Sequence, residues 1–123
     1  MLIRPKFLNL TKIHFPVAAV VSIVHRISGV LLSVSLPVLI YLFGLTIRDE
    51  HGYTIVVGLI DSIPGKLTLV FLLWNLAHHF LAGIRFLLID LDIGISKTTA
   101  ARGAWLVHFG AAGLALLALG LLL

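Results

Sequence analysis

The stretch from Trp74 to Asp92, WNLAHHFLAGIRFLLIDLD, decides the fold. It is too apolar for a helix that faces water, yet it carries the adjacent histidines His78 and His79 and a basic Arg85. Ionisable side chains inside an apolar helix are costly, and they usually face a protein interior. The stretch therefore predicts a membrane-spanning helix that carries chemistry, and the rest of the chain is expected to place it beside partners.

The composition indicates lipid as the main solvent. Of the 123 residues, 60% are hydrophobic and only 11% are charged, whereas soluble domains are nearer half apolar and a quarter charged. The absence of cysteine excludes disulfides and protein-ligated iron–sulfur clusters within this chain. The net charge of +4 could suggest nucleic acid, but no basic stripe alternates with aromatic residues. We therefore expect no nucleic acid among the partners, and the basic residues to contact lipid headgroups.

The apolar runs predict an all-α membrane protein with three transmembrane helices that packs as a helical bundle with another subunit. We expect spans at about residues 17–45, 67–89 and 103–123, within a single membrane-anchor domain that covers residues 1–123. Residues 1–16 are expected to form a basic segment on one membrane surface, since no convincing signal-peptide cleavage site follows.

Two prolines and two connections complete the outline. Pro37 is expected to kink the first span. The apolar residues 53–60 are too few to cross a membrane, so they are expected to lie along the interface until Pro64 and the glycine after it end the segment. Residues 90–102 form the short connection between the second and third spans.

The distribution of lysine and arginine predicts the orientation. The first connection has two basic residues against three acids, whereas the other side of the membrane is basic. The basic side comprises Arg4, Lys6, Lys12, Arg26, Lys97 and Arg102, with Arg85 nearby. This predicts a cytoplasmic N-terminus and an external C-terminus. The third span is rich in glycine and alanine, which favours a packing surface for a neighbouring helix, although a generic apolar span explains it equally well.

One face of the second span suggests a metal ligand. The residues at spacings i, i+4, i+7 and i+11 on this face are His79, Gly83, Phe86 and Asp90. His78 and Arg85 lie on a different face, about 100° around the helix. A histidine with glycine one turn later can reach a metal while a flat macrocycle lies against the backbone, which favours b-type haem iron. A histidine that is only hydrogen-bonded to a neighbouring helix is an equally good interpretation.

The first span carries a second polar group. Ser22 and Arg26 share one face, and His25 is next to it, at the level of Arg85. The arginines could neutralise haem propionates, and the serine–arginine pair could hydrogen-bond a quinone carbonyl. An arginine that only reaches the lipid headgroups explains Arg26 at least as well. His25 or His108 could in principle provide a second haem ligand, but we expect that ligand to come from another chain.

Three elements give the chain a family resemblance: RP at residues 4–5, SIVHRISG at residues 22–29 and HFLAGIRFLLID at residues 79–90. Together and in this order they resemble the cytochrome b membrane-anchor subunit of succinate dehydrogenase, or respiratory complex II. The resemblance covers the chain from Arg4 to about Asp90, and the third span carries no distinguishing motif.

The resemblance implies roles for individual residues. His79 matches the axial haem ligand, with the sixth ligand from a histidine of the small anchor subunit. Ser22 and Arg26 match the ubiquinone pocket. His25 and Arg26 match positions that reach the haem propionates, and Arg85 is a weaker candidate for the same contact. Many relatives have histidine where this chain has Phe86, so any contact made by that histidine is not carried over.

The implied protein is a membrane-anchoring subunit of succinate:quinone oxidoreductase in the bacterial inner membrane. Its expected partners are a flavoprotein, an iron–sulfur subunit and the small anchor subunit, and its expected ligands are haem b and ubiquinone. It would be part of the enzyme without binding the dicarboxylate itself. The alternatives are a fumarate reductase anchor that uses menaquinone, and a non-catalytic membrane scaffold.

Overall fold

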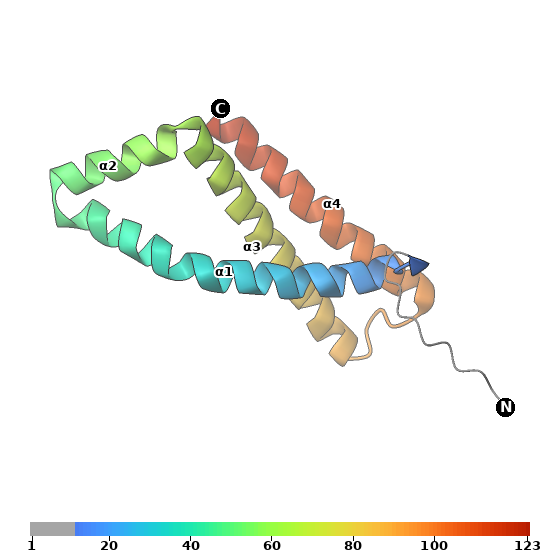
Figure 1. Ribbon diagram of the computed structural model, residues 1–123. Coiled ribbons are helices and arrows are strands. Elements are labelled where there is room, and N and C mark those ends of the chain that lie inside the picture. Colours follow the sequence, from blue (N-terminus) through green and yellow to red (C-terminus); the bar gives the residue numbers. More distant parts are fainter. Residues whose placement is uncertain (1–11) are drawn as a thin grey trace.

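The computed structural model describes residues 12–123, so the RP element at residues 4–5 lies outside the described residues. Four helices follow one another along the chain (Figure 1): α1 (Val17–Arg48), α2 (Glu50–Asp61), α3 (Ile63–Asp90) and α4 (Lys97–Leu122). All regular elements in this part of the chain are helices, which confirms the predicted all-α class.

Three of these helices, α1, α3 and α4, are long and apolar enough to cross a membrane, as predicted. The chain is therefore a multi-pass membrane protein. At about 1.5 Å per residue the 32 residues of α1 extend about 48 Å, well beyond a hydrocarbon core of about 30 Å. The helices extend beyond the predicted spans, because the spans followed hydropathy whereas helical hydrogen bonding continues into polar residues. This difference is largest for α4, which begins at Lys97 instead of about residue 103.

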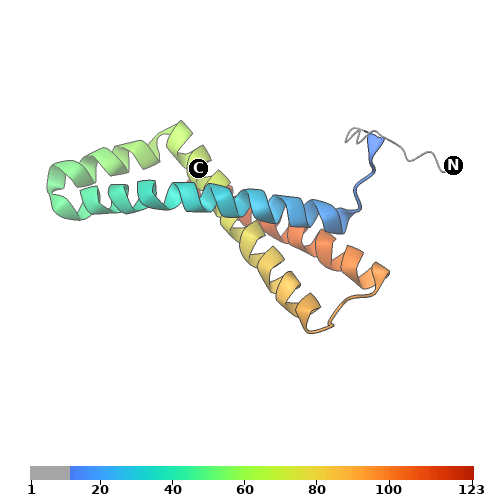
Figure 2. The ribbon, with the colours of Figure 1, turned by 60° about the horizontal axis from the view of Figure 1, so that its bottom comes forward.

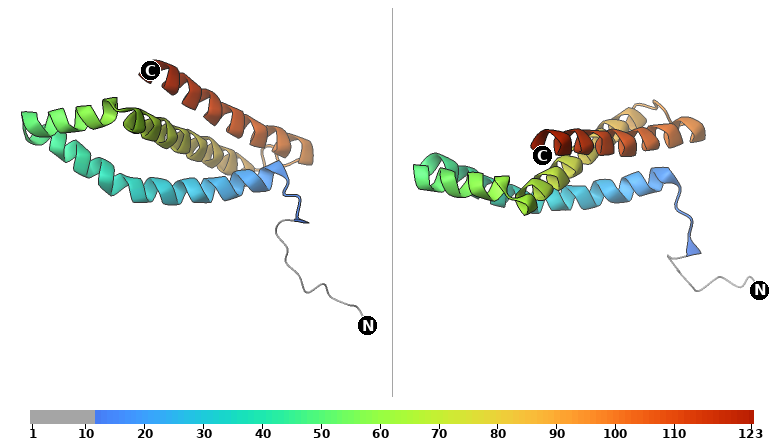
Figure 3. Two further views of the ribbon diagram at one scale, coloured as in Figure 1. Left: turned by 45° about the horizontal axis from the view of Figure 1, so that its top comes forward. Right: turned by 90° about the horizontal axis from the view of Figure 1, so that it is seen from above.

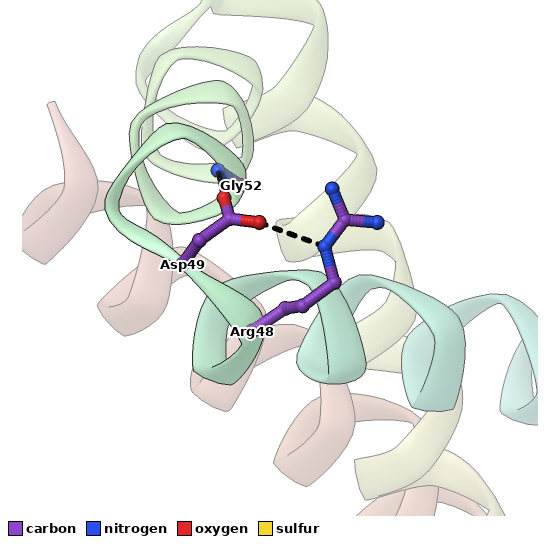
Figure 4. Close-up of polar contacts among 3 residues, drawn as sticks. All are labelled: Arg48, Asp49 and Gly52. Atoms are coloured by element: carbon purple, nitrogen blue, oxygen red, sulfur yellow. Dashed lines mark hydrogen bonds and ion pairs between the residues drawn. The ribbon is translucent and has the colours of Figure 1, made fainter.

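Short polar side chains define the helix ends. The Asp49 carboxylate caps α2 by accepting a hydrogen bond of 2.7 Å from the Gly52 N–H, and Arg48 Nε donates to it at 2.8 Å (Figure 4). The Arg48 guanidinium and then the Gly52 N–H hold the pKa of Asp49 below its ordinary value. The predicted interfacial segment is helix α2. Pro64 does not end that segment, because Ser62 already caps α3 and Pro64 lies in the first turn of α3.

The three long helices run in alternate directions and pack most closely at one end, where α1 begins, α3 ends and α4 begins (Figures 1 and 2). The buried cluster there takes residues from all three helices: Val21, Ala82, Ala104 and Val107. Away from this end α1 diverges from α3 and α4. Pro37 lies within α1 without interrupting it, and the helix forms a gentle arc (Figure 3).

Exposed apolar side chains cover most of the remaining helix surface, as expected for contact with lipid or partner helices. The small residues of α4 are divided between two environments. Gly110 allows close approach of Leu81, since an added Cβ would lie 3.0 Å from Leu81 Cδ1, and Ala111 is buried. Ala112 and Gly113 are exposed. Part of the predicted packing surface is thus used within the chain.

Candidate functional site

The crossing of α1 and α3 brings together two histidines that are far apart in the sequence. The rings of His25 and His79 are stacked, with centroids 4.1 Å apart and planes within 10° of each other. Both side chains are half-buried. The edge of Phe86 packs against His25 at a centroid distance of 5.2 Å.

The Nδ1 atom of His79 has two neighbours on α1. Ser28 Oγ lies 3.1 Å from it, and the His25 carbonyl oxygen also lies 3.1 Å from it. The Ser28 hydroxyl donates in turn to that same carbonyl at 2.9 Å, and Ser28 is fully buried. These contacts fix the orientation of the His79 ring through one of its two nitrogens.

Two glycines border the stacked rings. A Cβ added at Gly29 would lie 3.1 Å from Cε1 of His79, closer than nearly all real Cβ contacts, so glycine lets α1 approach this ring. A Cβ at Gly83 would meet Nε2 of His25 at 3.9 Å, an ordinary contact. The space that Gly83 leaves is thus bordered by His25 within this chain. His79, Gly83 and Phe86, which were predicted to share one face of this helix, all lie on the side of α3 that points at α1.

The neighbouring face of α3, on which His78 and Arg85 were predicted to lie, points at α4. His78 is fully buried, packed at 5.1 Å between ring centroids against His108, and neither ring nitrogen has a hydrogen-bond partner among the described residues. Arg85 Nη2 donates to the Ala100 carbonyl at 3.1 Å, beside a groove of about 260 Å³ between α3 and α4. Gly103 lies beside this guanidinium, where an added Cβ would meet Arg85 Nε at 3.5 Å, an ordinary contact.

Ser22 and Arg26 lie on α1 near the same end of the bundle. Ser22 is half-buried and Arg26 is exposed. Within residues 12–123 neither side chain takes part in a hydrogen bond or ion pair with the histidine pair. The structure thus brings His25 and His79 together, and among the described residues Arg26 contributes no hydrogen bond to that pair.

The residues present fit a site in which His79 provides one axial ligand of a haem. No group of three metal-binding side chains is present among the described residues, so this part of the chain offers no complete metal site of its own. His79, however, has the arrangement common to metal-bound histidines, in which the second ring nitrogen bonds to a carbonyl or hydroxyl. This leaves Nε2 as the nitrogen that could bind a metal.

The sequence analysis missed two residues of this site, Ser28 and Gly29. Both belong to the SIVHRISG element, but neither was assigned a contact to His79. The available signal was a serine and a glycine at i+3 and i+4 from His25. A short donor and a missing side chain at these positions permit close helix crossing.

These features define a class: a multi-pass helical membrane subunit that presents one oriented histidine where two spans cross. Residues 2–120 match the family described as succinate dehydrogenase/fumarate reductase transmembrane subunit, and the chain belongs to that family. This confirms the resemblance found in the sequence.

Two relatives agree with this assignment. The chain is 37% identical over 105 residues to the succinate dehydrogenase cytochrome b556 subunit of Coxiella burnetii (strain RSA 493 / Nine Mile phase I), covering 85% of this chain and 84% of the relative. It is 27% identical over 116 residues to the protein of the same name from Paracoccus denitrificans, covering 94% and 89%. The predicted role of a membrane-anchoring cytochrome b subunit in an oxidoreductase complex is thereby confirmed.

Proposed function

We propose that this chain, together with a small anchor subunit, binds haem b and helps to reduce ubiquinone in a succinate:quinone oxidoreductase. The observation that carries the proposal is the orientation of His79, whose Nδ1 is held by Ser28 Oγ and the His25 carbonyl, each at 3.1 Å. The name of the two relatives, cytochrome b556 subunit, supports a b-type haem.

His79 would provide one axial ligand, and a histidine of the small anchor subunit the other. His25 is a poor second ligand because its ring is stacked nearly parallel to that of His79, so the two rings cannot bind opposite sides of one iron. His108 lies on the other side of α3, against His78. When bound, the haem supplies a reversible one-electron store.

The haem propionates would be met by His25 and Arg26. Arg26 is exposed, and its guanidinium can donate hydrogen bonds to a carboxylate. Arg85 remains the weaker candidate, because its guanidinium already donates to the Ala100 carbonyl on the α4 side of α3.

Ser22 and Arg26 would bind the ubiquinone. They are one helical turn apart on α1, and together they offer a hydroxyl and a guanidinium, both of which can donate hydrogen bonds to a quinone oxygen. Their role would be to orient the quinone head and to polarise the oxygen that gains negative charge.

The remaining partners follow from the division of labour in such a complex. A flavoprotein would bind the dicarboxylate, and an iron–sulfur subunit would deliver electrons to the quinone, so this chain takes part in the enzyme without binding succinate. The N-terminus would face the cytoplasm of a bacterial cell, with the complex in the inner membrane. Lys97 and Arg102 begin α4 at the end of the bundle where α1 begins, which supports this orientation.

The first experiment is mild-detergent purification of the whole complex, followed by subunit identification and a reduced-minus-oxidised spectrum. We expect a flavoprotein, an iron–sulfur protein, a second small membrane protein and a b-type haem signal. A purified complex without haem would instead support the non-catalytic scaffold.

The quinone site is tested by Arg26→Ala. We expect loss of quinone reductase activity in a complex that still assembles, with Arg102→Ala, an exposed arginine of α4, as the matched control. Normal quinone reduction by the Arg26 variant would contradict the assignment.

The direction of the reaction has a second candidate. The description of the family covers fumarate reductase as well, so an anchor that oxidises menaquinol is compatible with the match. Comparing succinate oxidation with ubiquinone and fumarate reduction with menaquinol in the same preparation separates the two. The names of both relatives favour succinate oxidation.

A further inference from the structure

The hydrogen bonds around His79 determine which of its nitrogens carries the proton. The Ser28 hydroxyl has a single proton, which it donates to the His25 carbonyl at 2.9 Å. Its oxygen can therefore only accept from His79 Nδ1, and the carbonyl can only accept as well. With two acceptors 3.1 Å away, Nδ1 must be the protonated nitrogen, and Nε2 is left with its lone pair.

We infer that Ser28 is a positioning residue that, with the His25 carbonyl, holds His79 in the Nδ1-protonated tautomer and thereby lowers the reduction potential of the iron bound at Nε2. This inference rests on the proposed haem function. A proton shared with two acceptors gives the imidazole more anionic character, which makes Nε2 a stronger donor. A stronger donor stabilises ferric iron more than ferrous iron.

The geometry favours a role for Ser28 in positioning His79 over a purely structural role within α1. A serine that only bonds its own helix needs no partner across the helix crossing, and Ser35 is such a case, because it donates to the Leu32 carbonyl at 2.9 Å. Ser28 makes the same local bond but also reaches α3. Its full burial excludes bulk water as a substitute acceptor.

The test compares Ser28→Ala with Ser35→Ala in the complete complex by spectroelectrochemical titration of the haem. A hydrogen bond that is about 1 kcal/mol stronger to the ferric than to the ferrous form corresponds, when lost, to about a fivefold shift toward reduced haem at a fixed ambient potential. We expect this shift for Ser28→Ala and none for Ser35→Ala. Haem that remains bound with an unchanged potential in Ser28→Ala would overturn the inference, whereas a wild-type complex without haem would overturn the proposed function instead.

A measurement on the wild-type complex covers the case in which Ser28→Ala does not assemble. In the reduced complex, where six-coordinate ferrous haem is diamagnetic, ¹⁵N-labelled histidine gives a resonance for the iron-bound ring that ring currents displace. We expect its Nδ1 to carry a proton that exchanges slowly with water. A bare or rapidly exchanging Nδ1 would overturn the inference.

Discussion

His78 and His79 are consecutive residues of α3 with the same chemistry, yet they meet different environments. His79 faces α1, where two acceptors engage its Nδ1, and it remains half-buried. His78 faces α4 and is fully buried, and neither of its nitrogens has a partner among the described residues. Hydrogen bonds from another helix thus orient the ring of His79, whereas among the described residues the ring of His78 is held by packing alone.

The two environments follow from helix geometry. Consecutive side chains are separated by about 100° around the axis, so one residue turns to α1 and the next to α4. Trp74 and His108 pack against His78 at ring-centroid distances of 5.7 Å and 5.1 Å. On the α4 side the imidazole of His78 acts as an aromatic packing group. On the α1 side the imidazole of His79 is oriented by the hydrogen bonds of its Nδ1.

The largest expected effect is the loss of haem from one of two adjacent alanine variants. His79→Ala removes the proposed ligand, so we expect no b-type spectrum from the purified complex. His78→Ala should retain the haem, since this ring faces α4. Haem that persists in His79→Ala and disappears in His78→Ala would instead make His78 the ligand and place the iron on the α4 side of α3.

The next largest effect is expected at Gly29. In Gly29→Val the added Cβ would lie 3.1 Å from Cε1 of His79 and would displace the ring from its acceptors. We expect haem content per complex to fall by about tenfold, the lower end of effects seen when groups that orient a ligand are changed. Gly44→Val is the matched control, because nothing lies within 4 Å of a Cβ there. Equal haem content in the two variants would show that the crossing does not depend on this glycine.

A smaller effect is expected when the polar character of His78 is removed. His78→Leu replaces a buried side chain, whose two nitrogens have no hydrogen-bond partner among the described residues, by an apolar one of similar size. We expect the free energy of unfolding to stay the same or to rise by about 1 kcal/mol, measured as thermal stability of the purified complex. A clear loss of stability would show that this imidazole has a hydrogen-bonding partner in the assembled complex.

The smallest effect is expected for Arg85→Gln. Its guanidinium bonds to the Ala100 carbonyl, so the change should leave the haem potential nearly constant and lower thermal stability only slightly. The same change at Arg26 is expected to alter the haem potential. A potential that responds to Arg85→Gln as strongly as to Arg26→Gln would make Arg85 a full propionate contact.

Much of the fold could be predicted because lipid imposes strong rules. Long apolar runs identified the three spans, and the helical period assigned His79 and His78 to different faces. The helix ends could not be predicted from hydropathy, because caps such as Ser96, which accepts a hydrogen bond from the Thr99 N–H, extend α4 well before its apolar run.

The details of the site were harder to predict, for a physical reason. The stacking of His25 on His79 depends on where α1 crosses α3 and at what distance, and a single sequence does not contain that information. Ser28 shows this most clearly. Its local bond to the His25 carbonyl is ordinary for serine in a helix, and only the crossing adds His79 as a second neighbour.

The location of the buried cluster has a consequence for biosynthesis. Val21 and Ala82 complete their packing only with Ala104 and Val107, which belong to α4 and are translated after α1 and α3. The crossing of α1 and α3 at His25 and His79 therefore gains its supporting layer only after α4 has been translated. A chain interrupted after α3 would contain both histidines and still lack this layer. We therefore expect an intact α4 to be needed if the crossing is to bind haem.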